Sequence, residues 1–144
     1  MIAIDTNVLL RYLLDDDASQ SKKAAAIITA GDKVLITDVV LVETIWTLKG
    51  KKYKLDKEAI IIVINALFAE LNVIFEDGQT LWRALTDYTK EQPITAGVRG
   101  KEVDFPDLLI VNKAQNIANQ LKAVFDGVYT FDVALQAISG ARKP

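Results

Sequence analysis

Short apolar segments alternate with helical patterns along this chain, and this alternation limits the folds it can adopt. Strands are predicted at 1–5, 34–37 and 73–75, with one or two more between 124 and 130. Helices are predicted at 8–13, 19–30, 38–49, 57–71, 78–91, 105–119 and 132–139, with a loop at 92–103. Strands separated by helices favour an α/β fold with a mainly parallel sheet, which places ligands at the carboxyl ends of its strands.

The composition favours one globular domain spanning residues 1–144. The chain has 51% hydrophobic and 25% charged residues, which is enough to build a core and is not typical of a disordered chain. Its length is close to the commonest domain size. No apolar stretch reaches the ~20 residues of a membrane span, and the first residues lack the pattern of a secretory signal. We therefore expect a cytoplasmic protein without a membrane segment.

The absence of two residue types restricts the chemistry. The chain has no Cys and no His, which excludes disulfides, thiolate metal sites and imidazole bases. Catalysis must then rest on carboxylates, hydroxyls, Lys or Arg. The formal net charge of −2 gives no overall attraction to nucleic acid, although a local basic stripe could supply one.

Asp5 follows the first predicted strand and precedes the first predicted helix. This position puts its side chain at the carboxyl edge of the sheet, where a metal site could form. The same position also suits a helix N-cap, in which the carboxylate accepts hydrogen bonds from the next turn. Position alone leaves both interpretations open.

Glu43 lies on a helical face that is otherwise mostly apolar. Its neighbours at three and four residues are Val39, Val40, Trp46 and Thr47, so this face is predicted to turn inward. A buried carboxylate needs a partner, because burial without one costs several kcal/mol or forces protonation. A metal ion is favoured over a structural Arg or Lys.

Asp107 stands near the start of another helical pattern and shares a face with Ile110, Val111 and Ala114. We predict that Asp104 caps this helix and that Asp107 binds a metal. The alternative is a capping box, in which Asp107 reaches back to the cap, although Glu suits that position better than Asp.

Several carboxylates at one edge would repel each other and could not all ionise without a cation. Mg²⁺ or Mn²⁺, bound by oxygen, can resolve this repulsion and activate water for attack on a phosphodiester. Asp132 also follows a predicted strand, at 128–131, but its position alone does not assign it to such a site.

Four short motifs, taken in order, resemble the motif set of the PIN-domain ribonucleases. They are Ile4-Asp5-Thr6-Asn7, Glu43 within VVLVETIWTL, the segment DFPDLLI at 104–110, and Thr130-Phe131-Asp132. Within that family the chain most resembles the VapC-type toxins of bacterial and archaeal type II toxin–antitoxin pairs. The likeness covers essentially the whole chain and implies a three-layer α/β/α fold.

The resemblance also implies roles for individual residues. The implied metal-binding acids are Asp5, Glu43, Asp107 and Asp132. Thr6 and Asn7 would support these acids through hydrogen bonds, and Asp104 matches an acid often found three residues before the third, with its role open. The chain departs from the family pattern at Leu135, where an aromatic is usual, and at Pro106, where a small residue is common.

The function implied by the resemblance is Mg²⁺- or Mn²⁺-dependent endonucleolytic cleavage of single-stranded RNA or RNA loops. A homodimer, and inhibition by an antitoxin whose tail occupies the acidic groove, are implied as well. Candidate RNA contacts are Arg11, Arg83, Arg99, Lys101 and the stretch 49–54. The alternatives are an RNA-processing nuclease without an antitoxin, and a silent binding module, which would be expected to have lost a central acid. A receiver-like phosphate-transfer domain ranks low, because its acidic pair and later Lys are not found.

Overall fold

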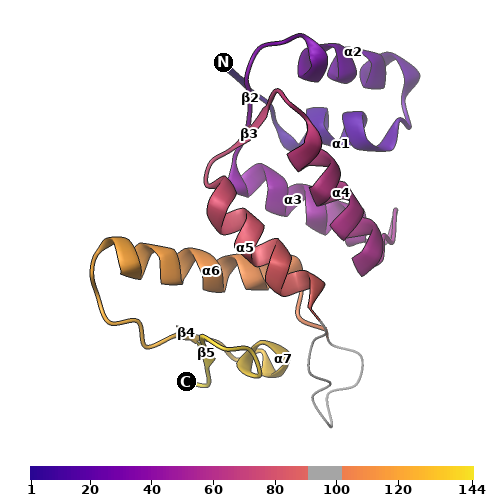
Figure 1. Cartoon of the computed structure of the whole chain (residues 1–144). Coiled ribbons are helices and arrows are strands. Elements are labelled where there is room, and N and C mark those ends of the chain that lie inside the picture. Colours follow the sequence, from indigo (N-terminus) through magenta and orange to yellow (C-terminus); the bar gives the residue numbers. More distant parts are fainter. Residues whose placement is uncertain (91–101) are drawn as a thin grey trace. The chain divides into compact units, whose positions relative to one another are not determined.

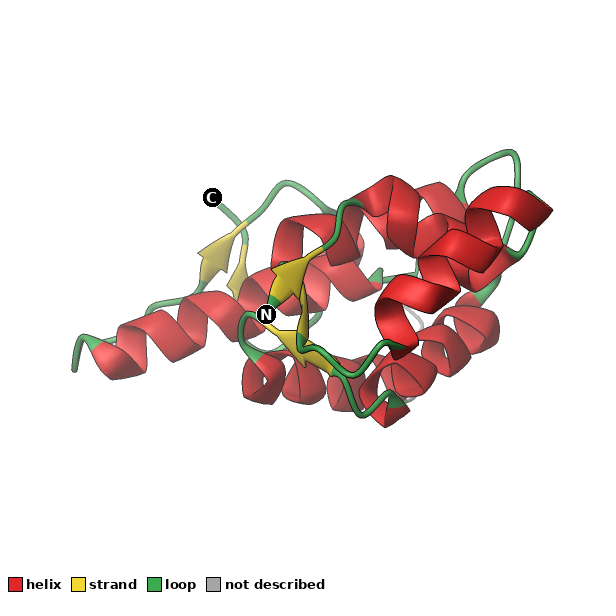
Figure 2. Ribbon diagram, turned by 90° about the horizontal axis from the view of Figure 1, so that it is seen from above, coloured by secondary structure: helices red, strands yellow, loops and turns green. Residues whose placement is uncertain are grey.

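The structure, a computed structural model, describes residues 1–90 and 102–144 in two compact units, Met1–Gly78 and Gln79–Pro144 (Figure 1). Most of the predicted loop at 92–103, with Arg99 and Lys101, lies outside the described residues. In both units the strands are short beside the helices (Figure 2). No helix within the described ranges has the length and apolarity needed to cross a membrane.

The first unit is built around a three-stranded parallel sheet. Its elements are β1 (Ile2–Ala3), α1 (Thr6–Leu14), α2 (Ala18–Thr29), β2 (Val34–Ile36), α3 (Asp38–Lys49), α4 (Lys57–Ala69) and β3 (Val73–Phe75). The strand order is β1-β2-β3, with Ile2 opposite Val34 and Ile36 opposite Phe75. A pair of helices separates each strand from the next, and this supplies the long crossover connection that parallel strands require. The predicted parallel arrangement is therefore present in this unit.

Oxygen-bearing side chains begin all four helices of this unit. Asp5, Asp17, Thr37 and Asp56 occupy the N-cap positions, and each accepts a hydrogen bond from a backbone N–H of the first turn. Such a cap satisfies a donor that has no partner within the helix. Gly31 follows α2 at φ +97°, a backbone conformation that favours glycine.

The core of the first unit is aliphatic. Its side chains come from the sheet and from all four helices, and the largest of them are fully buried: Leu9, Ile28, Val34, Ile36, Leu41, Ile45, Leu48, Ile60, Ile64 and Leu67. This core fixes how the helices approach the sheet, and so fixes where their N-termini lie.

The second unit contains two long helices and a small strand pair. Its elements are α5 (Gly78–Thr89, which begins at the boundary), α6 (Phe105–Gln120), β4 (Val128–Tyr129), α7 (Val133–Gln136) and β5 (Ala141–Arg142). β4 and β5 pair in parallel. β5 was not predicted, because two residues are too few to show an alternating pattern.

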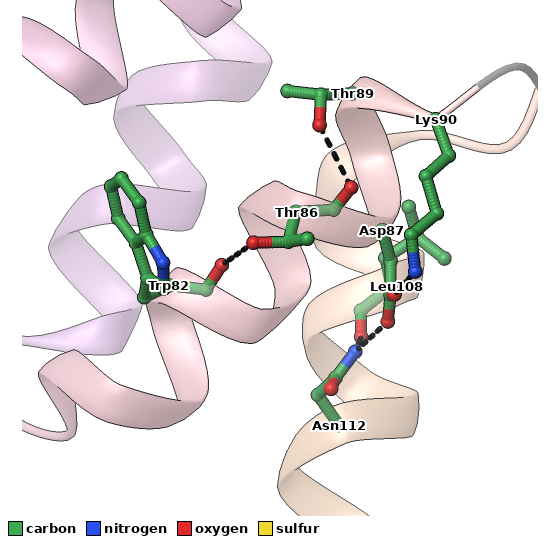
Figure 3. Close-up of polar contacts among 7 residues, drawn as sticks. All are labelled: Trp82, Thr86, Asp87, Thr89, Lys90, Leu108 and Asn112. Atoms are coloured by element: carbon green, nitrogen blue, oxygen red, sulfur yellow. Dashed lines mark hydrogen bonds and ion pairs between the residues drawn. The ribbon is translucent and has the colours of Figure 1, made fainter.

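A side-chain contact joins α5 to α6 (Figure 3). Asn112 on α6 donates from Nδ2 to Oδ2 of Asp87 and to the carbonyl oxygen of Leu108, both at 2.9 Å. Lys90 lies 3.2 Å from Oδ1 of the same carboxylate. Tyr88, next to Asp87 on α5, packs its ring edge to face on the ring of Phe105 at the start of α6, with centroids 5.8 Å apart. Polar and aromatic contacts together hold α5 against α6, the helix that carries two candidate acids.

Candidate active site

Asp5 lies two residues beyond β1, at the carboxyl end of the strand, and is exposed. Its Oδ1 accepts a hydrogen bond from the backbone N–H of Val8 at 2.9 Å, so the N-cap interpretation is confirmed. This bond engages only one carboxylate oxygen. It orients the side chain while Oδ2 can still face a ligand, so capping and metal binding are compatible roles for Asp5.

Thr6 connects the start of α1 to α3. Its hydroxyl donates a hydrogen bond to Oε2 of Glu43 at 2.6 Å, across 37 positions of sequence. The first unit therefore brings the segment beginning at Asp5 next to Glu43. A charge-assisted bond of this length restricts the rotamers of Glu43. Less side-chain entropy is therefore lost when a ligand binds.

The prediction that Glu43 faces inward is wrong. Glu43 is exposed, and its apolar neighbours Val39 and Trp46 are 67% and 60% exposed. α3 instead buries a different stripe, made of Leu41, Thr44, Ile45 and Leu48. Because apolar residues lie almost all around this helix, periodicity could not distinguish the buried face from the exposed one. The charge on Glu43 is therefore compatible with solvent and requires no buried partner.

In the second unit, Asp104 and Asp107 form the capping box that the sequence left as an alternative. Asp104 is the N-cap of α6, as predicted, and its Oδ1 accepts from the backbone N–H of Phe105 at 2.8 Å. Asp107 reaches back, with Oδ2 3.2 Å from the backbone nitrogen of Asp104. On the predicted inward face Val111 is buried but Ile110 is 53% exposed. Asp107 thus lies at the margin of the buried stripe, and the carboxylates of Asp104 and Asp107 are both ordered by backbone N–H groups.

Asp132 follows β4 and begins α7. Its Oδ1 accepts hydrogen bonds from the backbone N–H groups of Ala134 and Leu135, at 2.9 and 3.3 Å. Its own backbone N–H donates to the hydroxyl of Thr130. Leu135, which replaces the usual aromatic, is buried and packs in the core of its unit.

One acid at the sheet edge was missed. Glu76 directly follows β3, and its Oε2 accepts from the backbone N–H of Asp38 at 3.1 Å, so it adds a second cap to α3. The signal that could have found it is the one used for Asp5, an acid immediately after a strand. Asn7, which was expected to support the acids, lines a pocket between α1 and α2.

The carboxylates suit a hard divalent cation by their oxygen chemistry. Within the first unit, Asp5 and Glu43 are exposed acids that Thr6 connects, whereas Asp104, Asp107 and Asp132 belong to the second unit. In neither unit do three described acids gather closely enough to hold a metal ion. The acids of each unit fit such an ion in ligand type.

The Thr6 contact leads to a first prediction. Replacing Thr6 with Val removes the hydroxyl donor but keeps the side-chain shape, and should reduce the RNA cleavage that the sequence motifs imply roughly 10- to 100-fold, the usual loss when a supporting hydrogen bond at a metal site is removed. Thr6→Ser, which keeps the donor, should retain most of the activity. Initial rates of RNA cleavage measure both. Equal rates for Thr6→Val and wild type would contradict a supporting role.

Parallel strands joined through helices, with Asp5 after β1 and Glu76 after β3, define an α/β protein with acids at the carboxyl edge of its sheet. The family model for the PIN domain matches residues 2–138, and the chain therefore belongs to the PIN domain family. This match confirms the predicted fold class. Because PIN domains are in general nucleases, it also gives the broad class of activity. No protein in a search of curated sequences matches the chain.

Proposed function

We propose that the protein is a metal-dependent endoribonuclease and the toxin of a type II toxin–antitoxin pair. The observation that carries the nuclease assignment furthest is the hydrogen bond from Thr6 to Glu43. It joins the motif after β1 to the acid of α3, two of the four motifs on which the resemblance to PIN ribonucleases rests. The family match across residues 2–138 supports the same assignment.

We propose that residues 1–144 form one nuclease domain. The family match runs through both units, and this supports treating them as one nuclease domain. The proposed metal ligands are Asp5, Glu43, Asp107 and Asp132. Thr6 and Asp104 would orient these acids through the hydrogen bonds described above.

Mg²⁺ is the proposed ion, with Mn²⁺ as a substitute. When bound, such an ion activates water and offsets negative charge on a phosphodiester. The protein's own contribution is to hold the carboxylates in position. Asp5 and Asp132 are oriented by backbone N–H donors and Glu43 by a hydroxyl, so few side-chain rotamers must be fixed on binding.

The toxin role rests on the resemblance to VapC-type proteins, which also supports a homodimer and an antitoxin partner. An RNA-processing nuclease of the same fold is the alternative. Expression alone, and together with any small gene found beside its own, distinguishes them: a toxin arrests growth when expressed alone and not when its antitoxin is present.

Cleavage of single-stranded RNA by the purified protein tests the proposed enzyme. We expect products with Mg²⁺ or Mn²⁺ and none with a chelator, and activity should return when the metal is restored. Cleavage that continues in the chelator would contradict metal dependence. Failure to cleave any RNA from a total cellular pool would favour a silent binding module.

A further inference from the structure

A pocket of about 220 Å³ opens between α1 and α2, within the first unit. One of its lining residues is Asn7, two residues after Asp5. None of the proposed metal-binding acids lines it. Its volume is below the roughly 300 Å³ at which pockets for drug-sized ligands begin, so it suits a smaller group.

The lining combines three kinds of side chain. Val8, Ala24 and Ile27 give an apolar wall. The ionisable groups of the lining are both cations, Arg11 and Lys23, and the remaining lining residues are two amides, Asn7 and Gln20. The surface of the pocket is almost entirely apolar and suits a flat ring, and the two cations among its lining residues suit a phosphate.

Arg11 is held in place before any ligand arrives. Its Nη1 donates to Oδ1 of Asp16 at 2.6 Å and its Nε donates to Oε1 of Gln20 at 2.8 Å. Tyr53 donates to the other oxygen of Asp16 and secures this carboxylate. The bond and charge of Asp16 raise the pKa of Arg11, so its guanidinium stays protonated. A fixed guanidinium plane is a surface on which an unstacked base can lie.

We infer that this pocket binds one nucleotide of the single-stranded RNA, beside the strand that passes Asp5. The base would lie against Arg11 and the apolar wall, and Lys23 would contact a backbone phosphate. This inference rests on the proposed ribonuclease function and names a subsite for its substrate. Asp16 offsets the charge of Arg11, so the contact with a phosphate falls to Lys23; no acid lines the pocket itself, which favours an anionic ligand over a cation.

Two pairs of variants test the subsite. Lys23 and Lys22 are adjacent exposed residues of α2, but only Lys23 lines the pocket. Ile27 lines it and is 37% exposed, whereas Ile62 is an exposed isoleucine of α4, outside it. Lys23→Gln and Ile27→Ser are therefore the test variants, and Lys22→Gln and Ile62→Ser are their matched controls.

The measurement is the affinity for a labelled single-stranded RNA of about 12 nucleotides, by fluorescence anisotropy in chelator at several salt concentrations. Lys23→Gln should weaken binding roughly fivefold and reduce the salt slope by about 0.7, the value for one lost phosphate contact. Ile27→Ser should weaken binding by a similar factor and leave the slope unchanged, because it removes a contact with the base. Both controls should stay within about twofold of wild type.

The binding assay without metal tests the subsite, and the cleavage assay with metal tests the enzyme, so the two proposals can fail independently. Cleavage by wild type combined with equal affinities of Lys23→Gln and Lys22→Gln overturns the subsite, keeps the ribonuclease and leaves the pocket to a protein partner. Selective weakening by Lys23→Gln and Ile27→Ser without any cleavage supports the subsite as an RNA site and overturns the enzyme. An effect of Ile62→Ser equal to that of Ile27→Ser contradicts a base in the pocket.

Discussion

Replacing Asp5 with Asn should reduce metal-dependent RNA cleavage by at least about 100-fold and leave the fold intact. Asn removes the charge that the proposed ion requires. Its side-chain oxygen can still accept the N–H of Val8, which Oδ1 of Asp5 accepts at 2.9 Å, and Asn is as good an N-cap as Asp. The free energy of unfolding should therefore stay within about 0.5 kcal/mol of the wild-type value.

Asp56→Asn is the matched control for this experiment. Asp56 caps α4 with the same geometry, its Oδ1 2.9 Å from the nitrogen of Ala59, and it belongs to none of the four motifs. Cleavage rates and urea unfolding curves for the two variants separate loss of chemistry from loss of structure. If Asp5→Asn cleaves RNA as fast as Asp56→Asn, Asp5 is not a metal ligand.

Replacing Phe105 with Ala should cost about 3–5 kcal/mol of unfolding free energy, the usual range for deleting a buried aromatic side chain. Phe105 is fully buried at the start of α6 and packs edge to face on Tyr88 of α5. The cavity would open beside the ring of Tyr88. Such a loss is a large part of the 5–15 kcal/mol by which typical domains are stable, and it appears as a lower urea midpoint.

Phe131 provides the comparison, because it is also a phenylalanine of the second unit but is 88% exposed. Phe131→Ala should change the free energy of unfolding by no more than about 0.5 kcal/mol. A cost below about 1 kcal/mol for Phe105→Ala would contradict the packing of α6 against α5.

The sequence predicts this fold best where caps and an apolar pattern coincide. The bounds of α3 and β3 were predicted to the residue, because Thr37 and Gly50 flank the helix and Val73–Phe75 is a compact apolar run. β5 escaped prediction because its two residues carry no pattern. The exposed face of Glu43 was predicted wrongly because α3 is apolar on nearly every side, and only the packing of the sheet decides which side is buried.

Local sequence patterns predict where the candidate acids lie along the chain, but they do not predict which side chains contact each other. The position of Asp5 after a strand and of Asp104 before a helix followed from local rules, and both proved to be caps. The bond between Thr6 and Glu43 joins residues 37 positions apart. Only the tertiary approach of α1 and α3 creates it, and no local pattern carries that information.

The use of aspartates as helix caps has a consequence for how this protein can change over generations. A single-nucleotide substitution turns an Asp codon into an Asn codon, and at Asp5 and Asp132 the resulting amide would keep the oxygen that the backbone needs. Selection against the nuclease could therefore silence it in one genetic step without producing a misfolded chain. A folded, inactive descendant that still binds RNA or a protein partner lies next to the active form in sequence space.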